Sequence, residues 1–235
     1  ERLRNHPVHQ CPDREAHASL GHQYARLIRE RNTVAAKINA SSAKIVDEFA
    51  AVCQVLRKLQ FLSGDKVTER GARLRRIYGE RDLLVAQVIA QQSWADLNAE
   101  ELAAIVAGVV YEPRGDDTGT GASTYLGSVA LEEAWGETMA AYKQILKIEV
   151  GANSEATPEP SPTLIHPMFK WAKGASLARI LEETELSGGD FVRWVRQVLD
   201  MLDQLRRLDD SELARTANKA RQKLLHGVVA WTEFG

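Results

Sequence analysis

The feature that most constrains the fold is the spacing of apolar residues, which recur every three to four positions along most of the chain. In residues 188–208, GGDFVRWVRQVLDMLDQLRRL, this spacing places Phe191, Val195, Leu199 and Leu202 on one side of a helix. The sequence therefore predicts an all-α fold, a helical bundle. Similar helical runs cover residues 13–39, 41–62, 80–94, 98–112, 124–149, 164–174, 176–186 and 211–231.

Three segments interrupt the helical pattern. Residues 66–77, KVTERGARLRRI, are short and contain Gly71, so we expect a hairpin, the wing of a partial winged helix. Residues 114–123 are rich in glycine and predict a loop, and residues 151–163 carry three prolines and predict a linker. The run over residues 13–39 has only a thin apolar stripe, which is more typical of a projecting arm than of a core helix.

Charge, cysteine content and missing motifs exclude several classes of function. The chain has 235 residues and a net charge of −2, so any nucleic-acid site must be a local basic stripe. Two cysteines favour a reducing compartment, and we predict a cytoplasmic protein. No run of 18 apolar residues occurs, so we expect no membrane span. No Gly-Lys pair occurs, so the chain has no P-loop for ATP. A start at Glu1 without methionine suggests a piece of a longer protein.

Potential metal ligands occur near the start of the chain, where HPVHQC brings His6, His9 and Cys11 within six residues. A structural zinc site needs four ligands, and no second Cys or His pair follows at finger spacing. His166 and His226 are isolated, so no catalytic pairing is visible around either. We predict neither a metal nor a catalytic residue. A metal-dependent enzyme that uses His6, His9 and Cys11 is the weakest alternative.

The polar side of residues 188–208 is the candidate binding surface. Arg193, Arg196, Gln197 and Asp200 share this side of the helix, and Asp190 is expected to cap its N-terminus. The surface could be an ordinary solvated face on which Arg196 and Asp200 form an exposed ion pair, worth about 0.3–0.5 kcal/mol. It could also bind a nucleic acid, because arginine grips phosphate in a forked geometry and glutamine bonds to sugar or base.

Five stretches in the same order resemble the DSHCT domain, the C-terminal helical bundle of superkiller-type (Ski-like) DExH-box RNA helicases, including an actinobacterial branch. The stretch GASLARILEETELSGGDFVRWVRQVLDMLDQL carries most of the resemblance. The others are HPVHQCPDREAH, FAAVCQVLRKLQFL with VTERGARLRRIYGERDLLVAQ, LNAEELAAIVAGVVYEPR, and LLHGVVAW.

The resemblance implies a stalk-like helix over residues 1–40, the rest of a winged helix over residues 41–79, and the DSHCT bundle over residues 80–235. It implies that the bundle lines the channel for single-stranded RNA beside two RecA-like domains, which would bind ATP and Mg²⁺ and which this chain lacks. This chain alone would then bind no cofactor and hydrolyse no ATP.

Individual residues are also implied by the resemblance. Arg193 and Arg196 match basic positions of a segment that meets RNA in the family, whereas Gln197 stands where relatives often carry arginine. VVYEPR matches a second segment of the channel, and Glu112 and Arg114 are its candidate contacts.

Two questions remain open on the sequence alone. The strand could be RNA or DNA. The chain could instead be a helical scaffold without nucleic-acid contact that docks a partner, such as an RNA-degrading complex, through its first helix and the bundle.

Overall fold

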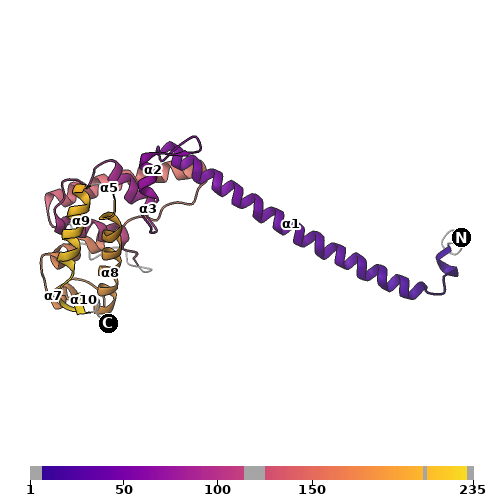
Figure 1. The fold of residues 1–235 in the computed structure, drawn as a ribbon. Coiled ribbons are helices and arrows are strands. Elements are labelled where there is room, and N and C mark those ends of the chain that lie inside the picture. The colour runs from indigo at the N-terminus through magenta and orange to yellow at the C-terminus, as the bar shows by residue number, and fades with distance from the viewer. Residues whose placement is uncertain (1–6, 114–124, 209–210, 232–235) are drawn as a thin grey trace. The chain divides into compact units, whose positions relative to one another are not determined.

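The computed structural model describes residues 7–113, 125–208 and 211–231. Within these residues the regular structure is helical apart from one two-stranded hairpin (Figure 1), which confirms the predicted all-α class. The chain divides into two compact units, Glu1–Ala50 and Ala51–Gly235. The predicted division at residues 40 and 79 stays a prediction.

The first unit consists of η1 (Pro7–Gln10) and most of α1 (Arg14–Lys58). Two helices were predicted over residues 13–62, but the structure has one long helix. No proline or glycine lies between residues 22 and 58, so nothing interrupts the helical hydrogen bonds. The apolar stripe of this unit is exposed. It comprises Leu20, Tyr24, Leu27, Val34 and Ile38, each more than half exposed.

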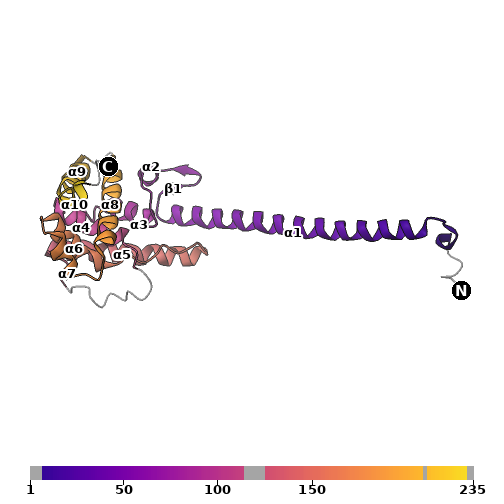
Figure 2. The same cartoon turned by 90° about the horizontal axis from the view of Figure 1, so that it is seen from below.

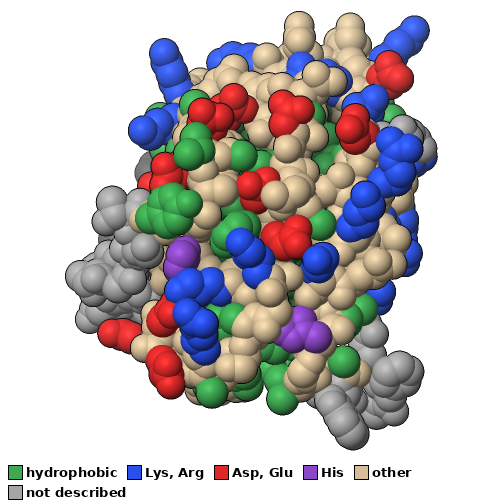
Figure 3. All heavy atoms as spheres, turned by 90° about the vertical axis from the view of Figure 1, so that its left-hand side faces the viewer, with side chains coloured by type: hydrophobic (Ala, Val, Ile, Leu, Met, Phe, Trp, Pro, Cys, Tyr) green, Lys and Arg blue, Asp and Glu red, His purple; other side chains and the backbone are tan. Residues whose placement is uncertain are grey.

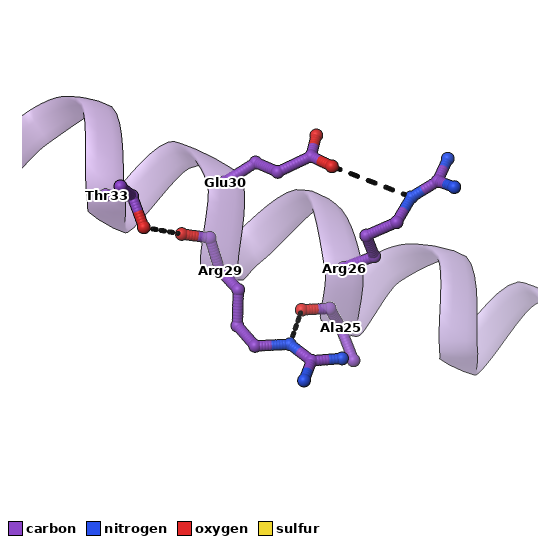
Figure 4. A network of polar contacts seen from close by, with 5 residues as sticks. All are labelled: Ala25, Arg26, Arg29, Glu30 and Thr33. Atoms are coloured by element: carbon purple, nitrogen blue, oxygen red, sulfur yellow. Dashed lines mark hydrogen bonds and ion pairs between the residues drawn. The ribbon is translucent and has the colours of Figure 1, made fainter.

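Between Ala25 and Thr33, three polar contacts are made within α1 itself (Figure 4). The Arg26 guanidinium lies 3.7 Å from the Glu30 carboxylate, one turn later. Arg29 donates to the Ala25 carbonyl at 3.2 Å, and the Thr33 hydroxyl donates to the Arg29 carbonyl at 2.9 Å. An exposed pair of this kind stabilises a helix by only about 0.3–0.5 kcal/mol.

The hairpin lies earlier than predicted, and the expectation of a hairpin over residues 66–77 was wrong. Strands β1 (Leu62–Ser63) and β2 (Lys66–Val67) pair antiparallel, and α2 (Glu69–Leu74) follows at once. Thr68 caps α2 by accepting from the Gly71 amide at 3.1 Å. Gly71 permits close packing, because a Cβ there would lie 2.3 Å from the Phe61 carbonyl oxygen. The winged-helix assignment stays a prediction.

The bundle of the second unit is built around α4 (Ala99–Val110), which is buried along almost its whole length. Asn98 and Glu101 form the predicted capping box at its start, with both amide contacts at 3.0 Å. Gly108 lets α6 approach, because a Cβ there would lie 2.8 Å from Ile165. The α-helices that pack on α4 include α5 (Val129–Ala152), α6 (Ile165–Ala172), α8 (Gly188–Leu205) and α9 (Ser211–Leu224).

The remaining elements complete the second unit. Helix α3 (Asp82–Ala90) packs on α5, and α8 and α9 lie side by side in both views (Figure 2). The shorter elements are η2 (Pro162–Leu164), α7 (Leu177–Glu182) and α10 (Gly227–Trp231). In the described part of the chain, none of the helices is both long enough and apolar enough for a membrane span.

The predicted linker over residues 151–163 is held against the bundle. Its first two residues finish α5, and the Glu149 carboxylate accepts from the Thr157 amide at 2.8 Å and from the Thr157 hydroxyl at 2.6 Å. The Ser161 amide donates to the Gly108 carbonyl at 3.0 Å. These hydrogen bonds fix Thr157 to α5 and Ser161 to α4. The predicted loop over residues 114–123 lies outside the described residues.

Candidate nucleic-acid interface

Helix α8 is a strongly amphipathic helix with a well-defined start. Its cap is Ser187, whose hydroxyl oxygen accepts from the Asp190 amide at 3.1 Å. The expectation that Asp190 is the cap was wrong: this residue lies in the first turn, where its carboxylate accepts from the Ser187 hydroxyl at 2.7 Å. The other side of the helix is buried in the core through Phe191, Trp194, Val195, Val198, Leu199, Met201, Leu202 and Leu205.

The predicted polar side of α8 faces solvent. Arg193, Arg196, Gln197 and Asp200 are all exposed. The Arg193 guanidinium lies 3.8 Å from the Asp190 carboxylate and 4.5 Å above the ring of Trp194, which is buried edge-on against Tyr111. These two contacts restrain the direction of the Arg193 side chain, while nearly half of that side chain, 45%, stays accessible.

Two grooves run along this side of α8 and share Gln197. We call the first the arginine groove. It has a volume of about 480 Å³ and an apolar floor between α7, the start of α8, and α10. Its lining residues are Leu177, Gly188, Gly189, Val192, Arg193, Arg196, Gln197 and Val228.

We call the second the carboxylate groove. It has a volume of about 540 Å³, and its lining includes both Glu112, just after the end of α4, and Asp200 of α8. The structure thus places all the described candidate residues along two adjoining grooves; Arg114 lies outside the described residues. Besides Glu112, Gln197 and Asp200, the lining residues are Tyr78, Gly79, Glu80, Arg81, Val85, Val109, Val110, Met201 and Gln204.

The charges of the two grooves differ in sign. Arg193 and Arg196 make the first groove basic, whereas Glu80, Glu112 and Asp200 make the second mainly acidic. Arg81 also lines the second groove but is committed to the fold, since it is only 4% exposed. Burial lowers the pKa of its guanidinium from the ordinary value, and the carboxylates of Glu112 and Glu80 act in the opposite direction.

Sequence reasoning missed the residues that hold the carboxylate groove together. The Arg81 guanidinium donates to the carbonyls of Val109, Pro158 and Glu159, each at 2.9 Å. It thus joins α3, α4 and the segment over residues 151–163. Gln204 accepts from the Tyr78 amide at 2.6 Å and donates to the Tyr78 carbonyl at 3.3 Å. Nothing in the local sequence around Arg81 distinguishes it from an exposed arginine.

A third groove provides a basic surface for comparison. It lies between the end of α8 and α9, with Arg206, Arg207 and Arg215 in its lining. The Asp203 carboxylate lies 2.6 Å from Arg206 and 3.1 Å from Arg221, which offsets part of the positive charge. Figure 3 shows Lys and Arg side chains along one edge of the face that it draws and also in its upper and lower left parts, with Asp and Glu side chains among them. A basic edge alone therefore does not single out the arginine groove.

The metal hypothesis receives no support from the described residues, where no group of three or more His, Cys, Asp or Glu side chains could hold a metal ion. His6 lies outside these residues, so the set of His6, His9 and Cys11 is not tested. Cys11 is a free cysteine whose Sγ lies 3.5 Å from His17 Nδ1.

The chain resembles known helicases along almost its whole length, and residues 64–232 match the DSHCT (NUC185) domain. It is 34% identical to "Probable helicase HelY" of Mycobacterium tuberculosis over 98% of this chain and 27% of that protein. It is 33% identical to the Mycobacterium leprae protein of that name, over 97% of this chain and 26% of that protein. It is 22% identical to human "Exosome RNA helicase MTR4" over 87% of this chain and 20% of that protein.

These similarities define a helicase-associated helical module. The chain belongs to the DSHCT domain family, as the quoted stretches predicted. It spans about a quarter of the length of the two mycobacterial relatives.

Proposed function

We propose that this chain is the C-terminal module of an ATP-dependent RNA helicase and that α8 guides the single strand past the motor domains. Family membership and the names of the relatives, which include an exosome RNA helicase, support this function. In this proposal ATP and Mg²⁺ are bound by RecA-like domains elsewhere in the longer protein, and the chain itself catalyses no reaction. A cytoplasmic location remains part of the proposal, because two cysteines favour a reducing compartment.

The observation that carries the proposal is the pair of exposed arginines in the arginine groove. Arg193 and Arg196 stand on a helix whose opposite side is buried in the core, so the helix that carries them is fixed to the rest of the bundle. A rigid helix with forked donors can follow the backbone of a single strand without reading its sequence. Gln197, between the two grooves, can bond to sugar or base.

The opposite charges of the grooves also orient the strand in this proposal. Phosphates are attracted to Arg193 and Arg196 and repelled by the three carboxylates of the neighbouring groove. Asp200 and Glu112 can therefore meet only the parts of a nucleotide that donate hydrogen bonds, which are sugar hydroxyls and the ring N–H and amino groups of the bases. This arrangement leaves the choice between RNA and DNA to be measured.

The salt dependence of binding tests the proposal. Each phosphate contact with a single strand contributes about −0.7 to the slope of log K against log salt. Replacing Arg193 and Arg196 together with alanine should therefore make the slope less steep by about 1.4, measured by fluorescence anisotropy with a short labelled RNA.

The matched control is Arg207→Ala with Arg215→Ala, which removes two arginines from the third groove and should leave the slope within about 0.5 of the parent value. An unchanged slope in the Arg193 and Arg196 variant would refute the role given to α8.

A second candidate function, a protein-interaction scaffold, is favoured by the exposed apolar stripe of α1. Leu20, Tyr24, Leu27, Val34 and Ile38 recur mainly at spacings of three, four and seven, as on a helix that packs against another helix. A partner captured from an RNase-treated extract, and lost when Tyr24 and Leu27 are changed to glutamate, would support this function.

A further inference from the structure

The two glycines at the start of α8 have no role in the fold that explains them. A Cβ at Gly188 would make only ordinary contacts, 3.6 Å to Leu181 and 3.7 Å to Leu177, and a Cβ at Gly189 would meet only the Ser187 hydroxyl at 4.0 Å. Neither glycine has a positive φ. Gly71 and Gly108, by contrast, would bring a Cβ within 3 Å of neighbouring atoms. The fold would accept side chains at positions 188 and 189, and alanine would favour the helix more than glycine does.

Because Gly188 and Gly189 have no side chains, the arginine groove stays open. Both glycines line that groove, together with the apolar side chains of Leu177, Val192 and Val228 from three different helices. Val228 is 43% exposed although it is apolar. The groove is thus an exposed apolar floor with guanidinium groups beside it, and its volume of about 480 Å³ lies within the range of small-molecule sites.

We propose that this floor receives a nucleobase of the strand whose phosphates Arg193 and Arg196 bind. A base has an apolar face that packs on aliphatic side chains, and its own phosphate carries the negative charge that the adjacent arginines complement. Glycine at the edge of the floor lets the sugar-phosphate backbone approach α8 closely. Contact with a base face is tolerant of sequence, as a strand that moves through a channel requires.

The inference rests on the proposed function, since it assigns the floor to the same strand. The occupant could otherwise be an apolar side chain of a protein partner. That alternative gives a different result in the test below, because a side chain in the groove implies no dependence of strand binding on the presence of bases.

The test compares a short oligouridylate with an abasic strand of the same length, which keeps the phosphates and lacks the bases. The parent chain should bind the intact strand about tenfold more tightly than the abasic strand. Gly189→Leu fills the groove from the first turn of α8, so this variant should bind both strands alike while the salt slope stays unchanged.

Two further variants keep the test decisive. Gly136→Leu adds the same side chain at an open position of α5, where a Cβ would meet nothing within 4 Å, and should preserve the tenfold preference. Val228→Asp alters the floor from α10 and should abolish the preference without relying on α8. The melting temperatures of all three variants should lie close to that of the parent, because every position is exposed or half-buried.

The outcomes separate the two proposals. If the parent chain binds intact and abasic strands equally, with a salt slope that depends on Arg193 and Arg196, the base-receiving floor is wrong and the proposed function stands. If Gly189→Leu retains the full preference for bases, the floor is also wrong. If no salt slope depends on the two arginines, the proposed function itself has failed.

Discussion

Replacing Arg81 with methionine is expected to lower the free energy of unfolding by about 4 kcal/mol. The substitution removes three hydrogen bonds to the carbonyls of Val109, Pro158 and Glu159, and it leaves these acceptors without the charged donor that joins them. Each unsatisfied buried polar group costs about 1–3 kcal/mol. The loss should appear in urea denaturation as a lower midpoint at a similar slope.

The controls for this prediction separate charge from geometry. Arg81→Lys keeps the charge but loses the fork that reaches three carbonyls, and we expect it to lose about half as much stability as the methionine variant. Arg75→Met, at an exposed position at the end of α2, should change the free energy of unfolding by less than about 0.5 kcal/mol. A methionine variant within 1 kcal/mol of the parent chain would show that these three bonds do not hold the segments together.

Reversing the charge of Arg193 and Arg196 to glutamate should weaken single-strand binding by about 100-fold at low salt. Each reversal turns an attraction to phosphate into a repulsion, and both positions lie in the same groove. The measurement is a binding titration with a labelled single strand at about 50 mM salt, where screening is weak. Circular dichroism should show an unchanged helix content, because both side chains face solvent.

The decisive comparison is Arg207→Glu with Arg215→Glu, which makes the same change in net charge in the third groove. For a strand that binds along α8, this second change acts only through the overall charge of the chain. The loss of binding affinity should therefore be no more than a few-fold. Equal losses in the two double variants would mean that the chain attracts nucleic acid through its general charge and that α8 has no special part.

The helices of the bundle could largely be predicted from the spacing of apolar residues. The buried side of α8 and the capping box at Asn98 and Glu101 follow from local patterns, because each depends on neighbours within two turns. The number of helices in the N-terminal region was harder to predict. A second helix was predicted to begin at residue 41, yet the helix continues through Ser41 and Ser42, because serine within a helix costs little. In the sequence, Gly71 indicates a turn. The structure gives another reason for a glycine there, its close contact with Phe61, which is a tertiary feature that the local sequence does not show.

For the candidate site, too, local sequence patterns predict the helix surface but not the contacts between distant segments. A helical wheel places Arg193, Arg196, Gln197 and Asp200 on one side, and the structure confirms that they are exposed. The pattern does not show that α7 and α10 supply an apolar floor beside the arginines, because Leu177 and Val228 lie outside α8 along the chain. Glu112 was placed by family resemblance alone. Arg81 could not be foreseen, since its partners are backbone carbonyls distant in sequence.

The most direct test of the central claim is a photo-crosslinking measurement from position 197. A benzophenone-bearing phenylalanine in place of Gln197 lies where the two grooves meet, and the same residue in place of exposed Lys143 on α5 serves as the control. We predict that a labelled single-stranded RNA crosslinks at position 197, that unlabelled RNA competes, and that position 143 gives little product. Equal yields at the two positions, or no product at 197 under conditions in which the chain binds the strand, would contradict the account.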